Sequence, residues 1–296
     1  MRKSLVYRED LRDSIRSEIA ERTKVHQARV AALKAVRPPA LAAGAGPSPL
    51  VMLAHGVSWF DYPLDGNGPL LQETDVIAQL QSIGNISPLV LNVSHFGDAT
   101  SEEMSWPKQQ RMIDALKDPN NWPSGKPDAI LFSGGGDDIA GNQFCIFLNY
   151  ADSSSSGLNA TRLHGALQMV QASYQDLFAF RDRNVPGVPI FGHCYDFAIP
   201  NGIHPLCAGP WLLPSLQFAG WNVSRGTTIV HDALLAFRAL LLNLASDPGN
   251  NFVLVDTQGT LQPSAWANEL HPTPEGFKLI AAQFASSLRL HFTGRI

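Results

Sequence analysis

The chain has 296 residues, of which 45% are hydrophobic and 16% are charged, so it carries enough apolar material for a sizeable core. Its net charge of −4 lacks the basic excess of nucleic-acid-binding proteins, and we expect no nucleic-acid partner. No apolar run reaches the ~18 residues of a membrane span, and none follows the charged start Met1-Arg2-Lys3 as a signal peptide would require. We therefore expect a cytoplasmic protein without a membrane span, in which three cysteines are too few for a disulfide framework.

The beginning of the chain reads as a single helix. Apolar residues recur among Arg, Glu and Lys at roughly helical spacing from Leu5 to Leu33, and Pro38-Pro39 ends the pattern. This predicts an amphipathic helical extension over residues 1–38, followed by one domain over residues 39–296. Three roles fit such a helix: packing on the domain surface, a flap over the site, or an arm that forms a homodimer.

The rest of the chain alternates between strand and helix patterns. Short apolar runs predict strands at 50–54, 87–93, 129–132, 188–191 and 252–255. Helical patterns lie between and after them, at 74–83, 108–116, 158–183, 228–245 and 274–290. This alternation predicts a three-layer α/β/α sandwich around a parallel sheet of about five strands. Residues 195–222 fit neither period and are rich in Pro, Gly and aromatic residues, which favours a lid or a pocket wall.

A serine follows the first predicted strand. Ser58 stands on a turn that begins at Gly56, at the edge of the sheet where open α/β proteins place their chemistry. A serine in such a place is more often a helix cap than a nucleophile. The stretch Gly56-Val57-Ser58-Trp59-Phe60 also lacks the second glycine of the α/β-hydrolase elbow. A catalytic role for Ser58 therefore depends on what the rest of the chain brings to it.

Three later stretches fall on the same predicted edge. Gly97 follows the second strand, and Gly134-Gly135-Gly136 with Asp137 follows the third, where backbone N–H groups suit an oxyanion hole. His271 precedes the last helix, between prolines that stiffen its loop, within plausible reach of Ser58. His95 and His193 are rival histidines on the same edge.

Taken together and in this order, the stretches Gly-x-Ser-Trp-Phe-Asp, Gly97, Gly-Gly-Asp-Asp and Glu-Leu-His-Pro resemble those of the SGNH (GDSL-type) hydrolases. The resemblance spans roughly Val51 to Phe284. It implies a flavodoxin-like sandwich and hydrolysis of esters, with Ser58 as nucleophile and His271 as base. It also implies oxyanion donors at the N–H groups of Ser58 and Gly97 and at a block-three side chain.

This chain departs from the family pattern at three positions. Val57 replaces the aspartate before the serine, which mainly supports the turn. Asp137 stands where the family has the asparagine of the oxyanion hole, and a carboxylate donates only when it is protonated. Either the pKa of Asp137 is raised or another donor, for which Asn142 is a candidate, replaces it.

The third departure concerns the group behind the histidine. Asn268 replaces the aspartate three residues before His271, and an asparagine there can hold the wrong tautomer. The site is therefore either a Ser-His dyad with a backbone or Asn268 acceptor, or a triad in which Glu269 or Asp256 supplies the charge.

These features predict a serine esterase for small or short-acyl carboxylic esters, with a small-molecule substrate and no cofactor or metal. An apolar acyl pocket would be walled by aromatic side chains, namely Trp59, Tyr195, Trp211 and Trp221. The alternative is a catalytically decayed SGNH-fold protein that only binds a ligand, since three departures occur together. A nucleophilic Cys194, on a strand-Gly-x-Cys turn, is a further rival.

Overall fold

A computed structural model describes residues 2–36, 47–63, 75–97, 99–141, 143–152, 154, 156–204 and 209–296. Its centre is one parallel sheet with the strand order β2-β1-β3-β4-β5. The strands are β1 (Val51–Gly56), β2 (Leu89–Asn92), β3 (Ile130–Ser133), β4 (Ile190–His193) and β5 (Phe252–Val255). All five predicted strands are present, and the order is the flavodoxin-like order that the family resemblance implies.

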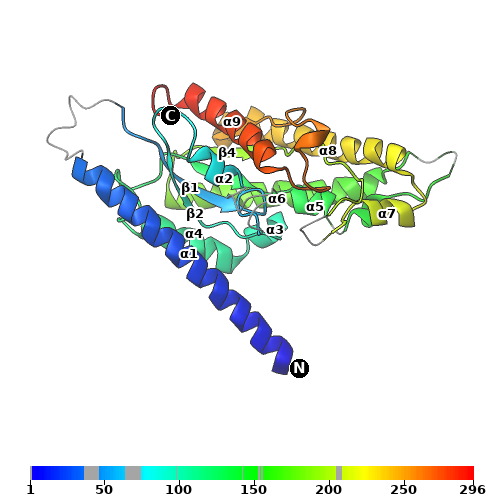
Figure 1. Ribbon diagram of the computed structural model, residues 1–296, viewed down its shortest axis with the longest axis horizontal. Coiled ribbons are helices and arrows are strands. Elements are labelled where there is room, and N and C mark those ends of the chain that lie inside the picture. Colours follow the sequence, from blue (N-terminus) through cyan, green and yellow to red (C-terminus); the bar gives the residue numbers. More distant parts are fainter. Residues whose placement is uncertain are drawn as a thin grey trace.

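Helices cover both faces of this sheet (Figure 1). On one face, α2 (Val76–Leu80) packs against α9 (Pro274–His291). On the other, α6 (Ala160–Asn184) contacts both α4 (Trp106–Lys117) and α8 (Val223–Ser246). Right-handed crossovers between parallel strands require this division of the helices. The predicted α/β/α sandwich is therefore confirmed.

Side-chain caps fix where the long helices begin. Asn159 accepts a hydrogen bond from the N–H of Arg162 at the start of α6, and Asn222 does the same for Arg225 in α8. Thr273 caps α9, whose first residue is a proline, which suits a position without an N–H partner. The cap of α9 also ends the loop that carries His271.

Several short elements escaped the sequence prediction. They are α3 (Thr100–Glu103), α5 (Gly136–Ala140), α7 (Leu213–Phe218), η2 (Phe144–Phe147), η3 (Pro248–Asn250) and η4 (Pro263–Ala265). None exceeds six residues, which is too short for a hydrophobic period to register. Residues 195–222, predicted as an irregular lid or pocket segment, contain the short helix α7, and their role as a lid or pocket wall stays a prediction.

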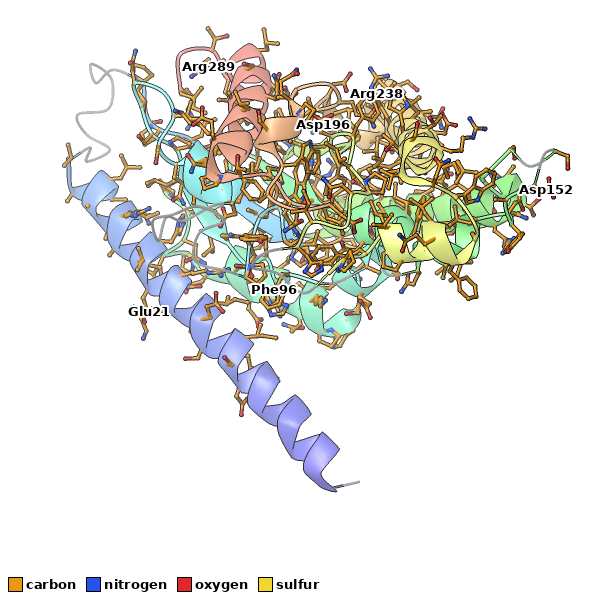
Figure 2. All side chains as sticks on the ribbon, turned by 45° about the vertical axis from the view of Figure 1, so that its right-hand side comes forward. Glu21, Phe96, Asp152, Asp196, Arg238 and Arg289 are labelled. Carbon is orange, nitrogen blue, oxygen red and sulfur yellow. The ribbon has the colours of Figure 1, made fainter. Side chains whose placement is uncertain are left out.

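The predicted N-terminal helix is α1 (Arg2–Val36), and its second half lies along the edge strand β2. His26 Nε2 lies 3.0 Å from the carbonyl oxygen of Asn121, after α4, and Arg29 donates to Gln81, after α2. The helix thus contacts both outer layers and covers the exposed edge of the sheet. Its first half projects beyond the body (Figures 1 and 2). The homodimer and the boundary near residue 38 stay predictions.

Among the described helices, α8 alone has the length and the apolar composition of a membrane span. Its inner face is buried against α6, α7 and β5, including Ile229, Leu234 and Phe237. A core helix of an α/β fold has the same composition, so this feature is weak evidence for a membrane.

Candidate active site

The turn that carries Ser58 is built directly on the neighbouring strand. Gly56, the last residue of β1, has φ +154°, and a Cβ there would lie 2.4 Å from the carbonyl oxygen of Ser133 in β3. That same oxygen accepts a hydrogen bond of 3.1 Å from the N–H of Val57. Ser58 follows at once, and its own N–H donates to no acceptor within the described ranges. Gly56 and Val57 therefore set the serine at the sheet edge with a free N–H beside it.

His271 meets this serine from the other end of the chain. Its Nε2 lies 2.9 Å from the Oγ of Ser58, across 213 positions of sequence. Burial lowers the pKa of His271 to about 3, so the imidazole is neutral near pH 7 and free to act as a base. The loop is held on the nucleophile side by Trp59, whose Nε1 donates to the carbonyl oxygen of Leu270 at 3.0 Å.

Asn268 fixes the tautomer of this imidazole. Its Oδ1 lies 3.1 Å from Nδ1 of His271 and also accepts the backbone N–H groups of Leu270, at 3.0 Å, and of His271, at 2.9 Å. Because two backbone donors face this atom, it must be the carbonyl oxygen of the amide and not the NH2 group. Nδ1 is then the protonated nitrogen, and Nε2 offers its lone pair to Ser58.

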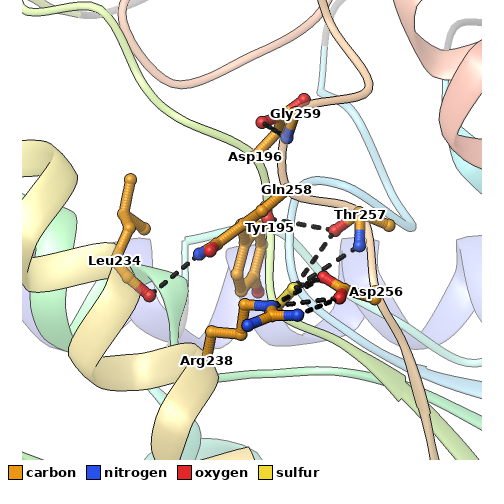
Figure 3. A network of polar contacts seen from close by, with 9 residues as sticks. Tyr195, Asp196, Leu234, Arg238, Asp256, Thr257, Gln258 and Gly259 are labelled. Carbon is orange, nitrogen blue, oxygen red and sulfur yellow. Dashed lines mark hydrogen bonds and ion pairs between the residues drawn. The ribbon is translucent and has the colours of Figure 1, made fainter.

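The other two candidate orienters lie elsewhere. Both carboxylate oxygens of Glu269 accept backbone N–H groups of residues 202–213. Asp256 pairs with Arg238, as Figure 3 shows. This hydrogen-bonded guanidinium lowers the pKa of the Asp256 carboxyl. Arg238 lies at the periphery of the molecule in Figure 2. Within the described chain, only Asn268 contacts Nδ1 of His271.

Ser58 and His271 open into a small cavity of about 30 Å³. Its wall includes Trp59 and Tyr195, which were predicted to line a pocket, Asp137, which was predicted at the oxyanion hole, and Trp266, which was not predicted. Tyr195 has φ +56°, a strained value for a side chain of this size, and such strain is often found at functional sites.

Other predicted site residues lie outside this wall. Gly97 sits on an exposed turn after β2, with φ +83°, and is not among the described residues that line the cavity. Trp211 packs against the ring of His271, and Trp221 donates to the carbonyl oxygen of Asn149; neither of them is among the described residues that line this cavity. Asn142 lies outside the described residues.

The two rival side chains at the end of β4 are buried. His193 Nε2 lies 2.8 Å from the Oγ of Ser133, and burial lowers its pKa to about 3. Its ring stacks on Trp59 with 5.2 Å between centroids, which makes it a support beneath the nucleophile turn. Cys194 is buried as well, and burial raises the pKa of its thiol, which disfavours the reactive thiolate.

The sequence analysis also missed Tyr62. Its ring lies 4.9 Å from that of His271, on a turn only four residues beyond Ser58. The one signal in the sequence was this closeness to the serine. Across the described part of the chain, no group of three His, Cys, Asp or Glu side chains could hold a metal ion.

Comparisons with known proteins show the family and the fold of the chain. The family model for GDSL-like lipase/acylhydrolase matches residues 65–284, a span that includes His271 and begins after Ser58. No curated protein matches the chain.

Solved structures share the fold. The lipase Lip_vut3 from a goat rumen metagenome has a TM-score of 0.53 and 14% identity, covering 80% of this chain and 97% of its own. A GDSL-like lipase from Parabacteroides merdae has a TM-score of 0.50 and 14% identity, covering 83% of this chain and 98% of its own. At such identities these structures support the fold alone.

Proposed function

Because the chain belongs to the GDSL-like lipase/acylhydrolase family and is thereby an ester hydrolase, we propose that it cleaves small, short-acyl carboxylic esters through an acyl-enzyme on Ser58. The observation that carries this proposal is the contact of 2.9 Å between Ser58 Oγ and His271 Nε2, with Asn268 behind the imidazole. A hydroxyl is a weak nucleophile, and a neutral imidazole at this distance is the base that it needs.

The proposed reaction has two halves. Ser58 Oγ attacks the ester carbonyl while His271 Nε2 takes its proton, and the tetrahedral intermediate collapses when His271 returns that proton to the leaving alcohol. Water then attacks the acyl-enzyme, with His271 again as base, and releases the acid and free Ser58. The N–H of Ser58 is one donor to the oxyanion. Asp137 lies on the same cavity wall and donates only when it is protonated.

The cavity supports a short acyl group. Its volume of about 30 Å³ is more than the ~10–15 Å³ that one water molecule needs by this measure, which suits a small acyl group such as acetyl. Trp59, Trp266 and Tyr195 give this space an apolar, aromatic wall. Two of these side chains, Trp59 and Tyr195, are buried, so the wall does not widen without movement of the core.

The proposal is tested with p-nitrophenyl acetate and a fluorophosphonate probe. We expect Ser58→Ala to lower hydrolysis by at least about 10³-fold and to abolish labelling. The matched control is Ser286→Ala, an exposed serine on α9, which should leave both unchanged. Hydrolysis that persists in Ser58→Ala would refute Ser58 as the nucleophile. A folded wild-type protein that neither turns over short esters nor reacts with the probe would instead favour the ligand-binding alternative.

A further inference from the structure

Glu269 is a fully buried carboxylate in the loop that carries His271. Its Oε1 accepts the N–H groups of Gly202 and Leu213 at 3.0 and 2.9 Å, and its Oε2 accepts those of Trp211 and Leu212 at 2.6 and 2.8 Å. In the described chain no Lys, Arg or His side chain forms an ion pair with it. Four backbone donors thus compensate a charge that would otherwise be costly to bury.

These hydrogen bonds tie two distant segments together. One is the loop before α9, and the other consists of Gly202 and of residues 211–213, where α7 begins. Trp211 is the residue of that second segment that reaches the site, with 5.5 Å between its ring centroid and that of His271 and 73° between the ring planes. Tyr62 packs near the same imidazole at 4.9 Å. Trp211 therefore helps to enclose the base and to restrict its rotation.

We infer that Glu269 is a positioning residue for the proposed reaction, acting through Trp211, which it holds against His271 through the backbone N–H groups of Gly202 and of residues 211–213. The inference rests on the function proposed above. The carboxylate has no hydrogen bond to the imidazole, so its effect reaches the base through the enclosure that Trp211 provides. In the described chain, the titratable side chains near this base are Tyr62 beside the ring, Glu269 itself, and Asp137, Tyr195 and Asp196 on the cavity wall.

The substitution Glu269→Gln separates this role from simple space filling. A glutamine has the same shape, but its amide offers one oxygen and one NH2 group. Whichever way the amide turns, the NH2 faces two backbone donors, either those of Gly202 and Leu213 or those of Trp211 and Leu212. The substitution should therefore loosen the segment that carries Trp211. Glu275→Gln, at an exposed glutamate in the first turn of α9, is the matched control.

For acetyl ester hydrolysis we expect Glu269→Gln to lower kcat about 10-fold while KM changes less than about twofold, because the base and not the acyl cavity is disturbed. Water that reaches the imidazole should also raise its kinetic pKa, so that activity falls below about pH 6, where the wild type stays level. Trp211→Ala should show the same two effects, and Trp211→Phe should largely restore the wild-type profile. The double variant should be no slower than the slower single variant.

Two results with Glu269→Gln, and a third with Trp211→Ala alone, would overturn the inference while leaving the esterase proposal intact. One is a Glu269→Gln variant that melts at a lower temperature but keeps the wild-type kcat and pH profile, since that is a structural role alone. The other is a double variant whose losses multiply, since Glu269 would then act independently of Trp211. If Glu269→Gln does not fold, the Trp211 variants decide, because a wild-type pH profile in Trp211→Ala also overturns the inference. Failure of the esterase proposal is recognised separately, by activity that survives Ser58→Ala.

Discussion

Restoring a carboxylate behind the histidine should make this enzyme faster. In Asn268→Asp, one carboxylate oxygen can keep all three hydrogen bonds that Oδ1 accepts, from Leu270, from the His271 backbone and from Nδ1. The Nδ2 of Asn268 is buried and has no partner in the described chain, so the substitution also removes an unpaired donor. The tautomer of His271 does not change, since the wild-type loop already enforces it. What the variant adds is a negative charge beside the imidazolium that forms during attack.

The size of the gain follows from the geometry. Two unit charges about 4 Å apart attract by about 4 kcal/mol at an effective dielectric constant of 20. The desolvation of the new buried carboxylate cancels part of this attraction. The two loop N–H groups that already face Oδ1 reduce that desolvation penalty. If about half remains, the barrier falls by about 2 kcal/mol, which corresponds to roughly 30-fold in kcat. The added charge also raises the pKa of His271 from its low value.

The assay is initial rates of p-nitrophenyl acetate hydrolysis between pH 5 and 8 for the wild type, Asn268→Asp and Asn268→Ala. The alanine variant removes the acceptor for Nδ1 and should lose about 10²-fold, because the imidazole is no longer held in one tautomer. An Asn268→Asp variant that melts near the wild-type temperature but is no faster would refute the reasoning. The charge of the imidazolium would then not limit the rate, or another group would already compensate it.

Two further predictions concern the same sheet edge. Asp137→Asn places an amide donor on the cavity wall and should raise kcat/KM for acetyl esters about 10-fold at pH 7; an unchanged rate would mean that residue 137 does not face the oxyanion. Burial lowers the pKa of His193 to about 3, below its unfolded value of about 6.5. The free energy of unfolding that this shift contributes is therefore complete above about pH 6.5 and is lost as the pH falls toward 3. By pH 5 the loss amounts to about 2 kcal/mol. His193→Gln can keep the hydrogen bond to Ser133, so urea unfolding of this variant should lose about 2 kcal/mol less than the wild type between pH 7 and 5. An equal loss in both proteins would contradict the assignment of that pH dependence to His193.

The fold could be predicted because its signals are local. Each strand is a short apolar run, and α6, α8 and α9 each begin at a side-chain cap, so the alternation of strands and helices can be predicted without any tertiary contact. The ends of the strands could be predicted less well. β3 and β4 continue through Ser133 and His193, which are polar residues past the apolar runs. They remain in the buried sheet because they hydrogen-bond to each other at 2.8 Å, a long-range contact that no local pattern announces.

The Ser-His pair could also be predicted, since both residues follow strands at one edge of a parallel sheet. The group behind the histidine could not be chosen from spacing. Asn268 and Glu269 are neighbours within three residues of His271, and either could turn toward its ring. Four N–H donors of residues 202–213 draw Glu269 away, and two N–H donors of the loop itself hold Asn268 in place. These two sets of N–H donors are formed only in the folded chain, where distant segments meet, so they could not be predicted from the sequence.

The departures from the family pattern at Asp137 and Asn268 have a joint consequence. Where the family has an amide in the oxyanion hole and a carboxylate behind the histidine, this chain has the reverse, so the number of carboxylates at the two positions is unchanged. The orientation of His271 survives the exchange because backbone N–H groups, and not a charge, decide which atom of Asn268 faces Nδ1. The exchange does remove the electrostatic stabilisation of the imidazolium, because Asn268 is neutral. In such a site Ser58 should attack esters in the correct geometry, but each proton transfer to His271 should have a higher activation barrier. This is the behaviour of a slow enzyme and not of a decayed one.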